Sequence, residues 1–143
     1  MPLSAGMPLW DKIEAGMPFE QARSLYPEGH VNTGKGLFRP MITIERVVDG
    51  CQMSIWILID RKVAEPEAKV ESVRLSGQKC DAKMFANLMA RYGQPQSNND
   101  DNRKQKEKKA IWVAEGKTIT FQVRYGSPDF WELTYAPIRD LGL

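Results

Sequence analysis

Met17-Pro18-Phe19-Glu20-Gln21-Ala22-Arg23-Ser24-Leu25-Tyr26 returns later in the chain as Lys83-Met84-Phe85-Ala86-Asn87-Leu88-Met89-Ala90-Arg91-Tyr92. In both stretches a Phe is followed by a Tyr seven residues later. Seven residues make two helical turns, so the Phe and the Tyr of each pair lie on one face of a predicted helix. The helices are expected over about 18–25 and 82–91, at an offset of 66 residues.

The segments that follow these two helices also match at this offset. Each contains a tight-turn dipeptide followed by a strand with alternating apolar and polar residues. A further strand follows in each half, at an offset of 60. The matched pieces are the turns Asp49-Gly50 and Glu115-Gly116, the strands Cys51–Ile59 and Lys117–Tyr125, and the last strands Val70–Leu75 and Phe130–Tyr135. Chance similarity is the alternative, because identity between the halves is low.

We therefore predict a single domain over residues 1–143, built of one repeat over 9–76 and a second over 78–137. Each repeat is read as a helix, a loop and three strands. Two such α-β-β-β units side by side give an α+β fold, a roughly six-stranded antiparallel sheet with the helices on one face. Residues 9–15 are expected to form a short amphipathic helix, 28–39 and 96–109 loops, and Asp81 a helix N-cap.

Composition limits the class of protein. Apolar residues make up 42% of the chain and charged residues 27%, which is typical of a soluble globular domain. The net charge of +2 is too small to indicate nucleic acid or an anionic membrane as a partner. No apolar run approaches the roughly 18 residues that a membrane span needs. The N-terminus shows no signal-peptide pattern, so the chain is either exported, with a signal peptide removed, or cytoplasmic.

The two cysteines, Cys51 and Cys80, leave two readings open. In an oxidising compartment they could pair and close a long loop. Otherwise they are buried free thiols. With no Cys-x-x-Cys motif and one histidine, we expect no metal site.

No catalytic constellation is present in the sequence. His30 lies in a glycine-rich segment without a nucleophile frame around it, so we expect a solvated loop histidine. Gly34-Lys35-Gly36 lacks the rest of a phosphate-binding loop. The basic run 103–109 is offset by nearby acidic residues and has no aromatic residues within it, which indicates a solvated loop rather than a nucleic-acid site. We expect no enzyme activity and no cofactor.

Trp56 is the most informative side chain for binding. It falls on the polar side of its strand, and the polar sides of the other strands extend the same face. A mixed polar face with one large aromatic residue is typical of a recognition surface, although an ordinary solvent-facing sheet is the alternative. The predicted partner-binding residues are Trp56, Gln52, Ser54, Arg74, Gln122 and Arg124.

The stretch Gly16-Met17-Pro18-Phe19-Glu20-Gln21-Ala22-Arg23-Ser24-Leu25 resembles the Gly-Met-Thr-x-x-Glu-Val-x-x-Leu opening of a known family. That family contains beta-lactamase inhibitory protein and the small lipoprotein of the outer-membrane assembly machine. Tyr92-Gly93-x-Pro95, followed by Trp112 and the Gly116 turn, is similar to the later part of the same unit. The resemblance implies an exported, periplasmic, non-enzymatic domain that binds a protein. It carries no contact residue over to this chain.

Two functional hypotheses follow. The first is a non-enzymatic protein-binding or inhibitory module that uses the open face of the antiparallel sheet and adjacent loops. The alternative is a small-molecule or lipid carrier with a pocket between helices and sheet, lined by Phe, Tyr and Met. An enzyme of unfamiliar type ranks below both, and the sequence indicates neither the partner nor the oligomeric state.

Overall fold

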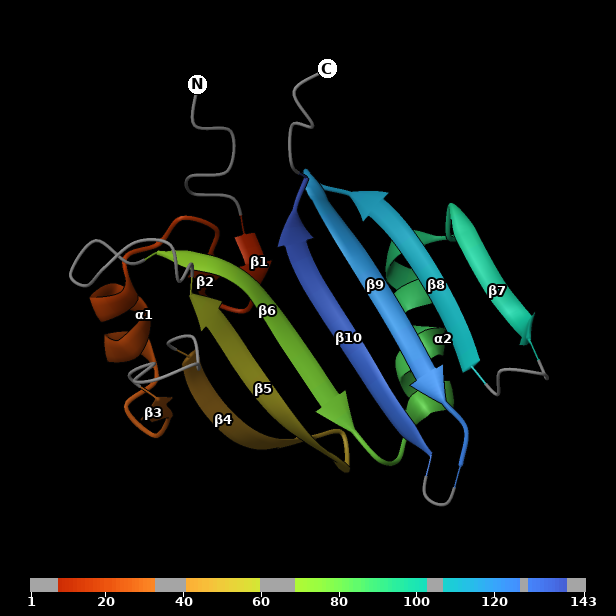
Figure 1. The fold of residues 1–143 in the computed structure, drawn as a ribbon, viewed down its shortest axis with the longest axis horizontal. Coiled ribbons are helices and arrows are strands. Elements are labelled where there is room, and N and C mark those ends of the chain that lie inside the picture. The colour runs from red at the N-terminus through yellow and green to blue at the C-terminus, as the bar shows by residue number, and fades with distance from the viewer. Residues whose placement is uncertain (1–7, 33–40, 60–68, 103–106, 127–128, 139–143) are drawn as a thin grey trace.

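The computed structural model of the chain describes residues 8–32, 41–59, 69–102, 107–126 and 129–138, which Figure 1 shows as coloured ribbon. Most of them belong to one antiparallel sheet of eight strands with two helices. In chain order the elements are β1 (Pro8–Trp10), β2 (Ile13–Glu14), α1 (Phe19–Leu25), β3 (His30–Asn32), β4 (Met41–Val48), β5 (Cys51–Ile59), β6 (Val70–Gly77), α2 (Asp81–Tyr92), β7 (Ser97–Asn102), β8 (Glu107–Ala114), β9 (Lys117–Arg124) and β10 (Phe130–Pro137).

The strand order is β3-β4-β5-β6-β10-β9-β8-β7, so β6 and β10 pair at the centre of the sheet. The predicted fold class, a six-stranded sheet made of two tandem α-β-β-β repeats, is wrong, because this sheet has eight strands. The two additional strands, β3 and β7, lie at the edges and come from segments that we predicted as loops. β7 is polar throughout, and β3 has three residues with Val31 between two polar ones, so neither shows the two-residue period of a half-buried strand over a useful length.

The N-terminal prediction is also wrong. Residues 9–15 were expected to form an amphipathic helix, but β1 and β2 form a small antiparallel hairpin there. Asp11 has a φ of 50°, which turns the chain sharply between the two strands. Leu9 and Ile13 are fully buried, as the helical reading also required. The four-residue spacing of Leu9 and Ile13 fits both a helix and this hairpin. In the structure, β1 packs against β6 and β10 at the middle of the sheet.

The other predicted elements are present. Helices occupy 19–25 and 81–92, and strands follow the turns Asp49-Gly50 and Glu115-Gly116 as expected. One detail differs at α2. Its N-cap is Cys80 rather than the predicted Asp81, and Cys80 has a φ of 73° and makes no side-chain capping hydrogen bond.

The core lies on one side of the sheet. Strand register aligns its buried side chains in rows across neighbouring strands. One such row comprises Ile42, Ile57, Val73, Tyr135, Ile119 and Trp112. In Figure 1, α2 crosses this side behind β8 and β9. Within the described residues, neither helix is long and apolar enough to cross a bilayer.

Two buried tryptophans attach the sheet to both ends of α2. The indole N–H of Trp112 donates to the carbonyl oxygen of Gly93, the C-cap of the helix, at 2.8 Å. The indole N–H of Trp131 donates to the carbonyl oxygen of Lys79, just before the N-cap, at 2.6 Å. Because buried indole N–H groups need a partner, these bonds fix where the helix lies along the sheet.

Candidate recognition surface

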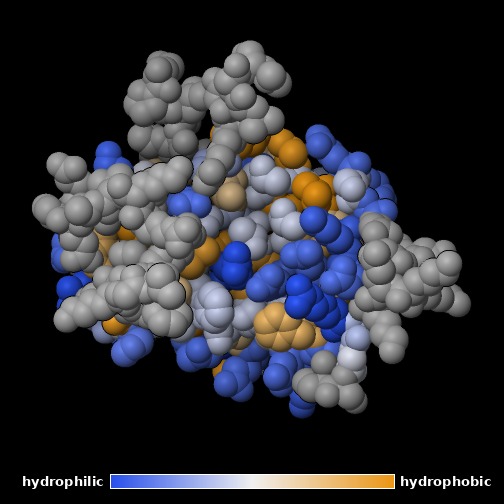
Figure 2. Space-filling model, in the orientation of Figure 1, coloured by the Kyte–Doolittle hydropathy of each residue, from blue (hydrophilic) through white to orange (hydrophobic). Residues whose placement is uncertain are grey.

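The six predicted partner-binding residues all lie on the sheet face opposite α2, which we call the open face. Each occupies a strand position that alternates with core positions, so its side chain points away from the core. Figure 2 views this face, and hydrophilic side chains predominate on its described part. The residues come from three strands: Gln52, Ser54 and Trp56 from β5, Arg74 from β6, and Gln122 and Arg124 from β9.

Trp56 and Arg74 are direct cross-strand neighbours in the β5–β6 ladder. The guanidinium of Arg74 also reaches the carboxylate of Glu132 on β10, with Nη1 and Oε1 3.8 Å apart. The Nε of Arg74 is buried and has no hydrogen-bond partner among the residues that the structure describes. A buried donor without a partner costs stability.

The remaining predicted residues are not gathered around Trp56. Gln122 is separated from Ser54 by β6 and β10, because the register runs from Ser54 through Ser76 and Glu132 to Gln122. Three strand spacings correspond to about 14 Å. Arg124 lies at the end of β9, where it forms an exposed ion pair of 3.4 Å with Glu107. The six residues therefore form a band across the sheet rather than one cluster.

The open face is not uniformly exposed. Leu58 and Ser72, which face each other across β5 and β6, are 5% and 7% exposed although they occupy the polar positions of their strands. Trp56 itself is partly buried. The freely accessible part of the face lies toward the opposite end of these strands, near the Asp49-Gly50 turn.

At that end the structure has a concavity of about 600 Å³, which we call the turn-end groove. A volume of this size falls within the range of ligand sites, about 300–1,000 Å³. Its polar lining includes Gln52 and Ser54 from the predicted set, joined by residues that the sequence argument did not select. The open-face groups of the groove are Glu45, Gln52, Ser54, Ser76, Gln78 and Phe130.

Two polar side chains of the groove, the exposed carboxamides of Gln52 and Gln78, are available to a ligand. The hydroxyl of Ser54 donates to the Glu45 carboxylate, at 2.8 Å from each oxygen. The side chains of Gln52, Gln78 and Ser76 make no hydrogen bond within the described part of the chain. A carboxamide both donates and accepts hydrogen bonds, so these side chains can bind either donors or acceptors of a partner.

Two exposed apolar residues flank the groove, and both were missed. Phe130 lines it from β10 and is 39% exposed, and Val47 on β4 is 69% exposed. Val47 is the register partner of Gln52. The signal was available in the sequence, because Phe130 alternates with the core positions of its strand in the same way as the polar residues Glu132 and Thr134.

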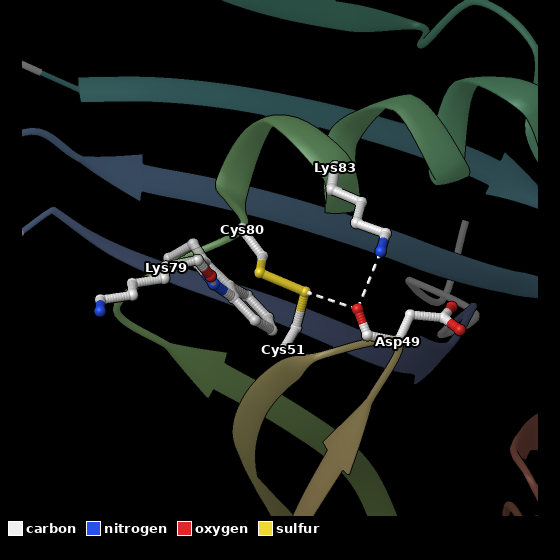
Figure 3. Close-up of a disulfide and its surroundings, with 6 residues drawn as sticks. Asp49, Cys51, Lys79, Cys80 and Lys83 are labelled. Atoms are coloured by element: carbon white, nitrogen blue, oxygen red, sulfur yellow. Dashed lines mark hydrogen bonds between the residues drawn. A yellow bond between two sulfur atoms is a disulfide. The ribbon is translucent and has the colours of Figure 1, made fainter.

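A disulfide lies behind the groove (Figure 3). It joins Cys51, the first residue of β5, to Cys80, and their Cα atoms are 6.0 Å apart. Beside it, the Lys83 ammonium donates to the carbonyl oxygen of Asp49 at 2.8 Å. The sequence left pairing and free thiols open, and in the structure the two sulfurs are bonded. Cys80 itself lines the groove, so the bridge helps to fix the groove wall.

The strongest pKa shifts lie on the core side of the sheet, away from the groove. Burial, then the hydrogen bond from its hydroxyl to Asp11 at 2.7 Å, raises the pKa of Tyr26 to about 12. Arg46 lies over the rings of Tyr26 and Trp10, with its guanidinium carbon 5.4 and 5.5 Å from their centroids. This cluster stabilises the packing of the N-terminal hairpin and α1, and none of its groups faces the groove.

The space between α2 and the sheet is occupied by aromatic rings. The centroid of Phe85 lies 6.0 Å from those of Trp112 and Phe121. The carrier alternative, which requires a pocket there, therefore gains no support from this region. Among the described residues, no group of three or more His, Cys, Asp or Glu side chains is close enough to hold a metal ion.

Comparison with known proteins does not identify the chain. No family model, no curated protein and no solved structure matches the chain. The function must therefore be argued from the surface itself.

Proposed function

We propose that the chain is a non-enzymatic protein-binding or inhibitory module that engages its partner through the open face. The observation that carries this proposal is the turn-end groove. Its Gln52 and Gln78 carboxamides have no hydrogen-bond partner among the described residues, and they lie between exposed Phe130 in the lining and exposed Val47 beside it. Protein interfaces combine apolar or aromatic anchors with polar groups that form hydrogen bonds to the partner. Trp56, Arg74 and Gln122 extend the same surface across the sheet.

Two further observations support the proposal. The resemblance of residues 16–25 to the beta-lactamase inhibitory protein family implies an exported domain that binds another protein. The Cys51–Cys80 bridge is compatible with that location, because structural disulfides persist mainly in oxidising compartments. We therefore include export in the proposal.

Site-specific photocrosslinking tests this function. The photoreactive residue p-benzoylphenylalanine is placed at Ser54 or Gln122 on the open face, and at Asn87 on the exposed side of α2 as the matched control. We expect a defined crosslinked partner from the open-face positions and none from Asn87. Equal yields from all three positions would contradict the proposed surface.

The partner identified in this way is then used for affinity measurements. Trp56→Ala should weaken binding about 30-fold, because truncation of an aromatic anchor typically costs about 2 kcal/mol. Arg124→Glu reverses a charge at the edge of the band and should act mainly on the association rate. Unchanged binding in both variants would remove Trp56 and Arg124 from the interface.

A further inference from the structure

The turn-end groove has a pattern that specifies the shape of its ligand. Val47, Gln52, Gln78 and Phe130 come from β4, β5, the end of β6 and β10, which are successive neighbours in the sheet. Val47 pairs with Gln52, and Ser54 pairs with Ser76, which places Gln78 beside Gln52 two residues further along. Across four strands the row therefore has an apolar residue, two carboxamides and a second apolar residue. Gln52, Gln78 and Phe130 line the groove, and Val47 lies beside it as the register partner of Gln52.

We propose that the groove binds an extended segment of a partner protein, lying across the strands, with apolar side chains at positions i and i+4. This inference rests on the proposed function and names the chemistry of its partner. Four strands span three spacings, about 14 Å, and four residues of extended chain rise by about the same distance. Residues i and i+4 of an extended segment also point to the same side.

The centre of the groove suits the backbone of such a segment. The Gln52 and Gln78 carboxamides each offer donors and an acceptor, which are the complements of peptide C=O and N–H groups. Both side chains are free of hydrogen bonds within the described residues, so they need not break an internal bond to reach a ligand. The lining of the groove contains one acidic residue, Glu45, and one basic residue, Lys79. An uncharged central segment is therefore favoured over a strongly acidic or basic one.

Two blocked pentapeptides of identical composition provide the probe. Acetyl-Leu-Ser-Ser-Ser-Leu-amide has its apolar residues four positions apart, and acetyl-Leu-Ser-Leu-Ser-Ser-amide has them two apart. Binding is followed by ¹H–¹⁵N NMR of the native, disulfide-bonded chain, using the side-chain amide signals of Gln52 and Gln78. We expect the first peptide to shift these signals and to bind about tenfold more tightly than the second, which can use only one of the apolar contacts.

Variants locate the contacts. Val47→Ser and Phe130→Ser should each weaken the first peptide about tenfold and bring it to the affinity of the second. The control is Val113→Ser, which removes an exposed apolar side chain from the same sheet face on β8. It should leave binding unchanged. An unaltered backbone spectrum shows that each variant is folded.

Several outcomes would overturn the inference. These are equal affinity for both peptides, shifts outside the groove, or groove binding by a neutral trisaccharide but not by either peptide. Concentration-dependent self-association through Phe130 without peptide binding would also overturn it. If photocrosslinking at Ser54 or Gln122 recovers a partner while the peptides fail, the proposed function stands and only the ligand class is wrong.

Discussion

The β4–β5 and β8–β9 hairpins have the same turn but differ in what holds it to the rest of the molecule. Asp49 and Gly50 have φ values of 53° and 79°, and Glu115 and Gly116 have 56° and 79°. Both turns thus place two successive residues in the left-handed region, as two-residue hairpin turns require. The next residue faces the core in both, and Cys51 and Lys117 are 3% and 4% exposed.

Cys51 is bonded covalently to the N-cap of α2, whereas Lys117 is held by polar contacts. Its ammonium donates to the carbonyl oxygens of Leu9 and Pro8 at 3.3 and 3.5 Å and lies 3.9 Å from the Glu115 carboxylate. It also lies 5.1 Å from the ring centroid of Tyr135. The same position behind a hairpin turn therefore attaches α2 in one half of the sheet and β1 in the other.

Removal of the disulfide should have the largest effect on stability. The bridge joins residues 29 apart in the sequence, and a loop of that length corresponds to about 3–4 kcal/mol of unfolding free energy. We expect Cys51→Ser combined with Cys80→Ser to lower the free energy of unfolding by this amount in urea denaturation. Reduction of the wild-type protein by a dithiol should give a similar loss. A change below about 1 kcal/mol would mean that the neighbouring Lys83–Asp49 contact already fixes the start of α2.

Substitution of Lys117 should have a smaller effect. Lys117→Ala removes the cation from two carbonyl oxygens and leaves space beside Tyr135, so we expect a loss of about 2 kcal/mol. Lys117→Met is the control, because it keeps the volume of the side chain and should cost less. Urea denaturation measures both variants. If both cost the same, packing is irrelevant and the ammonium contacts alone attach β1.

The pH dependence of stability tests how the protonation of Lys117 affects folding. Burial lowers its pKa from 10.5, while Glu115 opposes the shift and Arg91 adds to it. The unfolded chain therefore binds the proton more tightly, and this group's contribution to stability increases as the pH rises toward 10.5. Burial raises the pKa of Tyr135, whose contribution decreases above pH 10 as the unfolded chain ionises. The stability of the wild type relative to Lys117→Met should thus increase as the pH rises toward 10.5, since Tyr135 is common to both.

The two hairpins also show what the sequence could predict. Turn dipeptides and the two-residue period of β5 and β9 are local signals, and their positions follow from backbone preference and burial on one face. The edge strands β3 and β7 carry no such signal, because their pairing is decided by the exposed backbone of β4 and β8. For β1 and β2, Leu9 and Ile13 satisfy a helical and a strand reading equally, so only tertiary contact with β6 and β10 decides.

For the candidate site, alternation was enough to place Trp56, Arg74 and Gln122 on one face. It could not show that these residues form a band rather than a cluster, because the order of the strands depends on the pairing of β6 with β10. The turn-end groove depends on the same pairing, since it brings Phe130 next to the end of β6, on the side away from β5. The contact of Lys117 with β1 could not be predicted from the sequence either. No local feature of the β8–β9 hairpin specifies the N-terminal hairpin as its neighbour.

The smallest expected effect tests whether the two turns are equivalent apart from these attachments. Gly50→Ala and Gly116→Ala each place a Cβ on a residue at φ 79°, and this should cost about 1 kcal/mol in both hairpins. A Cβ at Gly50 meets no atom within 4 Å, so the cost there is backbone strain alone. Gly50→Asn and Gly116→Asn should cost less, because Asn tolerates this conformation. In the Cys51→Ser, Cys80→Ser background the cost of Gly50→Ala should stay the same within about 0.5 kcal/mol, as expected for independent contributions. A larger change in urea denaturation would show that the disulfide holds the turn itself in shape, and the two hairpins would then differ in their backbones as well as in their attachments.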